Sequence, residues 1–331
     1  MGKFVAYFFI SFFASLALTP VARKLAVRLN MYAHPNHRTS HNGAVPKFGG
    51  LAIIFAFVLG LAVAFSLDKS LFAGEGARVG SLVLGALLIF LTGALDDKFE
   101  LNCNVKLVIE LVVASLAFRA GWRVETILLP AAMEIHLGIF SYFLSVFWMV
   151  GVINAFNLID GLDGLAAGIA LVVSFVMISI AALFGNSLVA LISLLLAGAV
   201  LGFLRYNINP ASIFMGDSGS LSLGFIISCL SIEAASVQPG RIAFLVPFLL
   251  LGIPITDTLL AIVRRLRKGI HPFHADQEHI HHRLVKLGLS QPGAAMFIVG
   301  MSLILAIMAF LIAQGIHTDV EMYSQLLEKL R

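Results

Sequence analysis

Acidic and amide side chains gather at three places in the chain where they could hold a metal ion. These residues are Asp96, Asp97, Asn157, Asp160, Asp163 and Asp217. Adjacent carboxylates repel each other, so the Asp96–Asp97 pair favours a bound cation or a proton held by one member. Oxygen ligands of this kind suit Mg²⁺ or Mn²⁺ and offer nothing that zinc prefers. The three places therefore indicate metal-assisted chemistry, with a solvated helix end as the alternative for the isolated pair.

The segment N-A-F-N-L-I-D-G-L-D-G-L at 154–165 is the most informative of these places. It follows an apolar run, and no Lys or Arg within it neutralises its carboxylates. Asn157, Asp160 and Asp163 are spaced by three, which predicts one shared face of a helical turn. Gly161 would let the backbone approach a ligand closely. A calcium-binding loop is excluded because its ligand spacing and terminal Glu are absent, and a polar helix cap is the remaining alternative.

Two further polar segments have residues that suit phosphate. F-M-G-D-S-G-S at 214–220 opens an apolar run, where Asp217 and Ser218 predict a helix N-cap. The Gly-rich helix start could also bind phosphate or support a metal-bound carboxylate. The second segment holds three histidines among several arginines: His279, His281 and His282. A zinc site there lacks a Cys or a matching fourth ligand, so donation to phosphate oxygens and a basic loop attracted to anionic lipid are the two interpretations.

Three basic residues complete the candidate binding set. Lys47 precedes Gly49 and Gly50 at the start of an apolar run, which suggests an element of close approach. Lys106 and Arg205 lie at the ends of apolar runs, where snorkelling of the side chain to the membrane surface is the alternative explanation. We place all three among the expected substrate-binding residues.

The composition identifies the surroundings of these polar groups as a membrane. Of the 331 residues, 60% are apolar and 12% are charged, whereas soluble domains have about 45–50% and about 25%. A soluble enzyme and a disordered chain are therefore excluded. The two cysteines, Cys103 in a polar loop and Cys229 in an apolar run, argue against a disulfide scaffold.

The apolar runs predict an all-α integral membrane protein with about ten transmembrane helices in a single domain, 1–331, because a span needs about 20 apolar residues. The strand alternation of a membrane barrel is absent. We expect spans at about 4–22, 48–67, 79–95, 105–119, 139–154, 164–184, 187–204, 213–232, 242–263 and 294–314, followed by a tail at 315–331 with an interfacial helix. The first run lacks a cleavage site and precedes Arg23 and Lys24, so we interpret it as a retained anchor.

The distribution of charge among the loops predicts the orientation of the chain. Loops after the odd-numbered spans hold most of the Lys and Arg, with the richest at 20–47 and 264–292, so the positive-inside rule places them in the cytoplasm. The polar clusters all fall on that side, which predicts one cytoplasm-facing site with both termini outside. On the opposite side, two short apolar stretches around Pro130 within 121–138 predict a small exterior β-hairpin.

This arrangement favours phosphoryl transfer over transport. Oxygen-type metal ligands with basic and histidine donors suit an anionic, metal-complexed substrate such as a nucleotide diphosphate compound. A site at the membrane surface suits a lipid acceptor. A secondary transporter, the alternative of another class, would place its site near the bilayer midplane between internal repeats, whereas the acidic groups here lie at span ends and no repeat is visible. No nucleic-acid partner is expected.

The ordered motifs resemble a family of membrane enzymes, the polyprenyl-phosphate N-acetylhexosamine-1-phosphate transferases. P-K-F-G-G, A-L-D-D, N-A-F-N-L-I-D-G-L-D-G-L, F-M-G-D-S-G-S and H-I-H-H-R-L resemble the family's five motifs, in order, over almost the whole chain. H-I-H-H and V-P-K-F-G-G resemble the branch that uses UDP-N-acetylglucosamine to start O-antigen, enterobacterial common antigen or teichoic acid linkage. The alternative is the phospho-MurNAc-pentapeptide transferase branch, which typically has three consecutive histidines and T-P-T-M-G-G.

The resemblance implies a reaction in the bacterial inner membrane. N-acetylglucosamine-1-phosphate, or another HexNAc-1-phosphate, would pass from a UDP-N-acetylhexosamine to undecaprenyl phosphate, and UMP would leave. The resemblance also implies that Asp217 and Asn157 bind Mg²⁺, with Mn²⁺ as a substitute, and that Asp96 or Asp97 deprotonates or orients the lipid phosphate.

The same resemblance implies that Asp160 and Asp163 hold the nucleotide or support the metal shell, and that the three histidines contact phosphates or the sugar. All the remaining candidates are expected to bind substrate. They are Asn154, Asp160, Asp163, His279, His281, His282, Lys47, Lys106 and Arg205. Lys47 departs from the Met or Arg-Met of the family pattern. Which aspartate acts as the base stays open, as does a homodimer beside the membrane-lipid partners, and a single displacement is favoured over a covalent intermediate.

Overall fold

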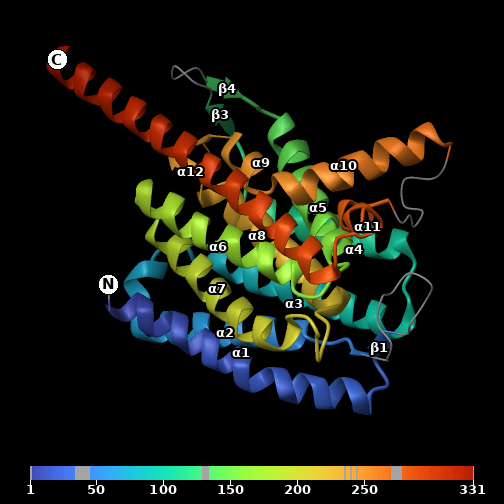
Figure 1. Cartoon of the computed structure of the whole chain (residues 1–331). Helices are drawn as coiled ribbons and strands as arrows, with labels where there is room; N and C mark the ends of the chain where they lie inside the picture. The colour runs from blue at the N-terminus through green and yellow to red at the C-terminus, as the bar shows by residue number, and fades with distance from the viewer. Residues whose placement is uncertain are drawn as a thin grey trace.

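The computed structural model describes residues 2–33, 45–128, 134–234, 236–238, 241–243, 245–269 and 278–330. Within these ranges the chain is built from α-helices joined by short strands and turns (Figure 1). The helices are α1 (Gly2–Arg28), α2 (Gly50–Leu67), the 3-10 helix η1 (Lys69–Phe72), α3 (Gly76–Phe99), α4 (Cys103–Arg119), α5 (Phe140–Ile159), α6 (Leu165–Leu183), α7 (Ser187–Asn207), α8 (Gly216–Ala234), α9 (Leu245–Leu250), α10 (Gly252–Arg267), α11 (Ile280–Lys286) and α12 (Gln291–Leu330). Three segments lie outside the described residues: 34–44 and 270–277, within the basic loops expected at 20–47 and 264–292, and 129–133, within the hairpin expected at 121–138.

The helices confirm the expectation of an all-α membrane protein. In the part of the chain that the structure describes, seven helices are long and apolar enough to cross a membrane: α1, α2, α3, α5, α6, α7 and Gln291–Thr318 of α12. The other predicted spans coincide with α4, α8 and the pair α9–α10, and the count of ten spans stays a prediction. Large apolar side chains such as Phe13 (58% exposed) and Phe147 (74% exposed) face outward, as contact with lipid requires.

Helix α8 lies at the centre of the bundle. All its residues from Ser218 to Ala234 are buried, because α8 packs against α2, α3, α5 and α6. Small residues permit this packing: a Cβ atom at Gly224 would lie 2.7 Å from the Cα atom of Ile153 in α5, an approach typical of membrane helix pairs. Helix α8 therefore fixes the relative positions of the helix ends that carry the acidic motifs.

The ninth predicted span, 242–263, is divided into two helices. Helix α9 ends at Leu250, and α10 begins at Gly252. Pro254 explains the break, since its ring lacks an N–H donor and would clash with the carbonyl of the residue four positions earlier, which is Leu250. Figure 1 shows α10 leading away from the body of the bundle.

A four-stranded sheet lies where α4 ends and α5 begins, with the order β4-β3-β6-β5. Its strands are β3 (Thr126–Leu128), β4 (Glu134–His136), β5 (Ser236–Gln238) and β6 (Arg241–Ile242). Strands β3 and β4 pair antiparallel in the segment where the sequence predicts a hairpin. Strand β6 pairs parallel with β3 and antiparallel with β5, so the chain between α8 and α9 completes a sheet that the sequence did not predict. The exterior position of this sheet stays a prediction.

The tail is not a separate helix. Helix α12 runs without interruption through Gly315 to Leu330, because one Gly weakens a helix by only about 1 kcal/mol and does not have to end it. The interfacial helix predicted at 315–331 is therefore the end of α12, which projects from the bundle in Figure 1.

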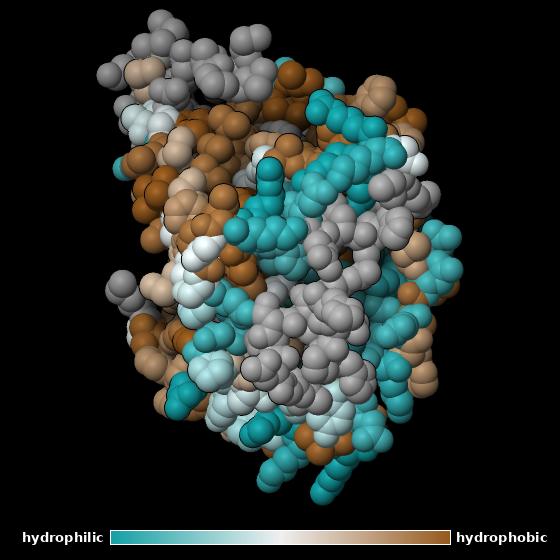
Figure 2. All heavy atoms as spheres, turned by 45° about the vertical axis from the view of Figure 1, so that its right-hand side comes forward, coloured by the Kyte–Doolittle hydropathy of each residue, from teal (hydrophilic) through white to brown (hydrophobic). Residues whose placement is uncertain are grey.

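The polar helix ends lie together at one end of the bundle. In Figure 1 the two chain termini lie on the left, whereas α11, the end of α10 and the small pair of strands β1 (Tyr32–Ala33) and β2 (Val45–Pro46) lie toward the right. Exposed basic residues mark this right-hand end: Arg23, Lys24, Arg28, Lys98, Arg267 and Lys268. Figure 2 shows hydrophilic side chains gathered on this face beside a flank of hydrophobic ones.

Candidate active site

Asp97, near the end of α3, caps the start of α8. Its Oδ1 atom accepts a hydrogen bond from the backbone N–H of Asp217 at 3.0 Å, and its Oδ2 atom accepts one from the backbone N–H of Ser218 at 3.1 Å. The first N–H groups of a helix have no partner within the helix, and the positive end of the helix dipole favours an anion there. The sequence assigned this capping role to Asp217 or Ser218, which is wrong: the cap comes from another helix.

Glycines make this contact between α3 and α8 possible. A Cβ atom at Gly93 would lie 2.4 Å from the backbone oxygen of Asp217, and one at Gly216 would lie 2.5 Å from Oδ2 of Asp97. Gly216 also has a φ of +73°, a conformation that side chains disfavour. Both glycines therefore allow the end of α3 and the start of α8 to lie in close contact.

The P-K-F-G-G segment is hydrogen-bonded to the chain that leads into α8. The backbone N–H of Gly49 donates to the carbonyl of Phe214, and that of Gly50 donates to the carbonyl of Met215, both at 2.9 Å. Lys47 forms an isolated parallel bridge with Phe214, and its Nζ atom lies 3.4 Å from Oδ1 of Asp97. The sequence predicted a close approach at Gly49 and Gly50. In the structure, the backbone of these two glycines contacts the backbone of Phe214 and Met215.

Lys106 lies between the carboxylates of Asp96 and Asp217. Its Nζ atom lies 2.6 Å from Oδ2 of Asp96 and 3.5 Å from Oδ2 of Asp217. Oδ1 of Asp96 accepts a hydrogen bond from the backbone N–H of Leu101 at 2.7 Å. Adjacent in sequence, Asp96 and Asp97 therefore have separate partners, and each has a lysine beside it.

The acidic residues after α5 do not share one helical face. The helix ends at Ile159, and of the three predicted side chains only Asn157 lies within it, where its Nδ2 atom donates to Oγ of Ser220 at 3.1 Å. Asp163 instead turns to the loop after α7, where its Oδ2 atom accepts from Nδ2 of Asn209 and from the backbone N–H of Ala211. The predicted shared face is wrong because the helix stops before Asp160.

Asp160 is close enough to this cluster to sense its charge. Burial, and to a smaller extent the neighbouring carboxylates of Asp97 and Asp163, together raise the pKa of Asp160 to about 7. A bound cation would therefore favour the ionised form of this carboxyl group.

Asn154 has a partner that the sequence did not identify. Its Nδ2 atom donates to Oε2 of Glu110 in α4 at 2.6 Å, and Glu110 is buried at 2% exposure. A single acidic residue inside an apolar run, as at Glu110, was the available signal, since intramembrane carboxylates need a partner.

The histidine helix α11 is held against α10 by Asp257. Nδ1 of His279 lies 2.8 Å from Oδ2 of Asp257, and the backbone N–H of Ile280 donates to Oδ1 of Asp257 at 2.9 Å. Asp257 is buried and stands in an otherwise apolar stretch, which was the signal for it. This carboxylate fixes the orientation of the His279 ring, as the partners of functional histidines commonly do.

His281 brings α11 against the segment that contains Asp160. A Cβ atom at Gly161 would lie 2.2 Å from Nε2 of His281, so this glycine makes room for an imidazole. Burial, and to a smaller extent the neighbouring His282 and His279, together lower the pKa of His281 to about 4. The rings of His281 and His282 have centroids 4.1 Å apart, which places all three histidines in one group.

Arg205 stands apart from these groups. It is exposed near the end of α7, and among the described contacts none joins it to the carboxylates or histidines. Snorkelling explains its position without a ligand.

The charges of the cluster fit a divalent cation. Among the described residues, four carboxylates, those of Asp96, Asp97, Asp160 and Asp217, are accompanied by two lysines, Lys47 and Lys106. The described residues contain no group of three or more His, Cys, Asp or Glu that could hold a metal by themselves. Mg²⁺ commonly needs only one or two carboxylates, since waters and substrate phosphates complete its shell. The donor set therefore fits Mg²⁺ that binds together with an anionic substrate.

Comparison with known proteins identifies the family of this chain. Residues 79–235, which include the Asp96–Asp97 pair and Asp217, match glycosyl transferase family 4. A probable undecaprenyl-phosphate N-acetylglucosaminyl 1-phosphate transferase of Bacillus subtilis is 37% identical over 94% of this chain and 86% of its own length. A decaprenyl-phosphate N-acetylglucosaminephosphotransferase of Mycolicibacterium smegmatis is 36% identical over 94% of this chain and 80% of its own.

A relative of lower sequence identity has a name of the same kind. The undecaprenyl-phosphate alpha-N-acetylglucosaminyl 1-phosphate transferase of Escherichia coli is 30% identical over 86% of this chain and 77% of its own length. These matches confirm the resemblance and the branch indicated by the five motifs. The chain belongs to glycosyl transferase family 4.

Proposed function

We propose that this protein transfers N-acetylglucosamine-1-phosphate from a UDP-sugar to undecaprenyl phosphate and releases UMP. The observation that carries the proposal is the start of α8, where Asp97 caps the helix and two lysines and four carboxylates surround it. The names of the relatives describe transfer of N-acetylglucosamine phosphate to undecaprenyl or decaprenyl phosphate, which supports the general reaction. A phosphotransferase of this type needs cationic groups and a positioned acceptor, since catalysis of phosphoryl transfer is mainly positioning and charge stabilisation.

Asp217 and Asn157 are the proposed ligands of Mg²⁺. Asp217 lies in the first turn of α8, and Asn157 contacts the same helix one turn later through Ser220. Bound Mg²⁺ would reduce the negative charge of the donor's diphosphate and so lower the barrier to approach of a second anion. Lys106, between Asp96 and Asp217, and Lys47, beside Asp97, are the proposed partners of the phosphate oxygens, and their positions beside the carboxylates support this role.

The two adjacent aspartates take different roles in this proposal. Both oxygens of Asp97 accept backbone N–H groups of α8, so Asp97 positions Asp217. Asp96 is assigned the orientation of the lipid phosphate and the acceptance of its proton. An oxygen of the lipid phosphate then bonds to the β-phosphorus of the UDP-sugar, the bond from that phosphorus to the bridging oxygen breaks, and UMP leaves with that oxygen.

An apolar groove beside α5 supports a lipid substrate. A cavity of about 210 Å³ lies between α5 and the pair α9–α10 and is lined by Phe147, Trp148, Phe248, Ile255 and Leu259. Almost all of its lining is apolar, which suits a polyprenyl chain. The basic residues exposed at the same end of the bundle as the carboxylates support a cytoplasmic position of the site and an exterior position of the termini.

The test is a donor panel with the purified protein in lipid nanodiscs. UDP-N-acetylglucosamine and undecaprenyl phosphate should yield UMP in the presence of Mg²⁺, and EDTA should stop the release until Mg²⁺ or Mn²⁺ is restored. UMP release only from UDP-MurNAc-pentapeptide would move the chain to the other branch. Turnover that persists in EDTA would contradict the metal, and absence of UMP with every donor would contradict the reaction.

A further inference from the structure

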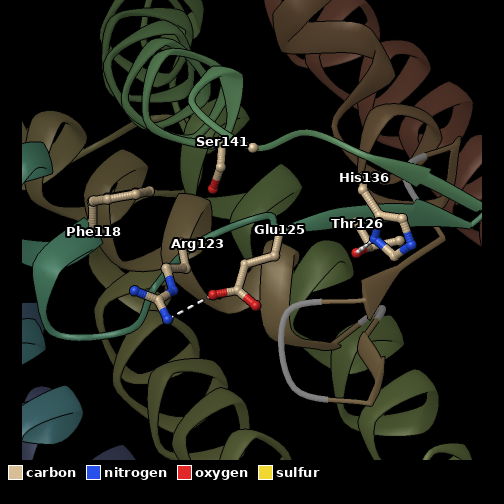
Figure 3. Close-up of a pocket in the computed structure, with 7 residues that line it drawn as sticks. Phe118, Arg123, Glu125, Thr126, His136 and Ser141 are labelled. Atoms are coloured by element: carbon tan, nitrogen blue, oxygen red, sulfur yellow. Dashed lines mark hydrogen bonds and ion pairs between the residues drawn. The ribbon is translucent and has the colours of Figure 1, made fainter.

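A pocket lies at the opposite end of α4 and α5 from the carboxylates. It has a volume of about 400 Å³ and is lined by the end of α4, the strands β3 and β4, and the start of α5. Figure 3 shows its polar side chains: Arg123 on one side, His136 on the other, Glu125 between them and Ser141 above. The proposed transfer reaction uses none of these residues.

The pocket presents both signs of charge side by side. An Nη2 atom of Arg123 lies 2.6 Å from Oε1 of Glu125, and both side chains stay nearly half exposed, at 43% and 47%. His136 lies 3.0 Å through its Nδ1 atom from Oγ1 of Thr126. A ligand that carries an anion and a cation a few bonds apart would find a partner for each charge here.

Ser141 supplies an independent sign of a ligand. The residue is buried at 6% exposure, and its Oγ atom has no hydrogen-bond partner among the described residues. Figure 3 shows the hydroxyl directed into the pocket. A buried hydroxyl without a partner is unfavourable, and a ligand oxygen in the pocket would satisfy it.

The neighbouring surface indicates that the ligand is a lipid. Beside the pocket, α4 exposes Val112 and Leu116, and α5 exposes Phe140 and Phe143, each at 47–68%. Tyr142 packs edge-to-face on Phe118 of the pocket wall, with ring centroids 5.2 Å apart. Aromatic rings of this kind mark the level of the lipid headgroups, so a molecule seated in the pocket can lay an acyl chain along α4 and α5.

We propose that this pocket binds the headgroup of a zwitterionic phospholipid that carries a phosphate and a primary ammonium group. The phosphate lies against Arg123 and accepts a hydrogen bond from the Ser141 hydroxyl. The ammonium donates to Glu125. A quaternary ammonium has no N–H to donate, and a headgroup without a cation leaves Glu125 facing the phosphate, so the site selects phosphoethanolamine over phosphocholine and phosphoglycerol.

The test is native mass spectrometry of the whole protein, released from detergent after exchange with equal amounts of the three phospholipids. The phosphoethanolamine lipid should be retained about tenfold better than the other two, the effect of one hydrogen bond between charged groups. Arg123→Ala should reduce retention of all phosphate lipids. Glu125→Gln should abolish the preference, because the phosphoethanolamine lipid loses its charged acceptor while the phosphoglycerol lipid no longer faces a carboxylate, so that the two lipids are retained equally.

Two further variants separate binding from folding. Ser141→Ala keeps the shape of the site and should reduce retention at least threefold, the loss expected for one hydrogen bond. Lys69→Ala removes an exposed cation of η1 that does not line the pocket, and should change nothing. UMP release should stay at the wild-type level in every variant. Equal retention of the three lipids, or a preference that survives both Arg123→Ala and Glu125→Gln, would overturn the proposal.

Discussion

Asp97 and Ser218 are 121 residues apart in sequence, yet Oδ2 of Asp97 accepts a hydrogen bond from the backbone N–H of Ser218 at 3.1 Å. The end of α3 and the start of α8 therefore form one unit. An aspartate at a helix C-terminus meets the unfavourable end of its own dipole. Here that disadvantage is offset, because the same carboxylate faces the favourable end of a second helix.

The contact between α3 and α8 should be sensitive to one added methyl group. Gly93→Ala places a Cβ atom 2.4 Å from the backbone oxygen of Asp217, so the helices must move apart. We expect a loss of about 1–3 kcal/mol in the free energy of unfolding, together with a loss of UMP release. Unfolding in urea and a turnover assay would measure both.

Gly80→Ala is the matched control in the same helix. No atom lies within 4 Å of a Cβ at Gly80, so alanine should stabilise α3 by up to about 1 kcal/mol and leave turnover intact. Equal effects of the two substitutions would show that close packing at Gly93 is not what the site requires.

Asp217→Ala should abolish transfer and leave the fold intact. The substitution removes a proposed metal ligand, but the cap of α8 remains, because Asp97 bonds to the backbone of residue 217 and not to its side chain. We expect UMP release to fall by at least about a hundredfold, with little change in the unfolding temperature. Wild-type turnover of this variant in Mg²⁺ would refute the metal assignment.

Asp257 and His279 should act as one unit in donor binding. Asp257→Asn keeps the volume of the side chain but cannot accept both the His279 N–H and the Ile280 N–H, so we expect a loss of about 1–3 kcal/mol in stability. If His279 binds the diphosphate, KM for the UDP-sugar should rise, and KM for the lipid phosphate should not. A double-mutant cycle with His279→Gln should show strong non-additivity, whereas additive losses would place the two residues in separate roles.

Acidic pH should destabilise the protein through His281. Burial, His282 and His279 lower the pKa of this group to about 4 in the folded chain, against about 6.5 in an unfolded one. The folded state therefore binds fewer protons, so the stability is complete above about pH 6.5 and is lost as the pH falls through about 4. A shift of this size corresponds to at most about 3–4 kcal/mol at neutral pH.

Thermal unfolding at several pH values would measure this contribution. His281→Leu should show a smaller decrease of the unfolding temperature between pH 7 and pH 4.5 than the wild type. His136→Leu, which replaces a largely exposed histidine, should keep the wild-type slope. A wild-type slope in His281→Leu would mean that other groups dominate this pH range.

The sequence predicted those features that depend on residues close to one another along the chain. Apolar runs of sufficient length predicted the helices. Short motifs predicted that Asn157 and Asp217 belong to one site, and Asn157 contacts the start of α8, where Asp217 lies. The partner of Asp97 was not predictable in this way, since the hydrogen bond joins helix ends that meet only after folding. For the same reason the turn of Asp163 toward the 209–211 loop was missed.

Other features left a local signal that pattern reasoning passed over. Pro254 marks the break between α9 and α10, and Glu110 and Asp257 are single acidic residues inside apolar runs. Each of these residues lies in an apolar run that was identified as a transmembrane span from its average hydropathy. An average hides the one polar group that needs a partner, and the partners of Glu110 and Asp257 are Asn154 and His279.

The cap of α8 by Asp97 also bears on how the protein is made. Synthesis of the 120 residues from Asp97 to Asp217 takes roughly 6–24 s at about 5–20 residues per second. Throughout that interval the nascent chain carries Asp97 without either of its backbone donors. The reaction centre therefore cannot form before α8 enters the bundle, so that no competent enzyme exists until this helix has been inserted.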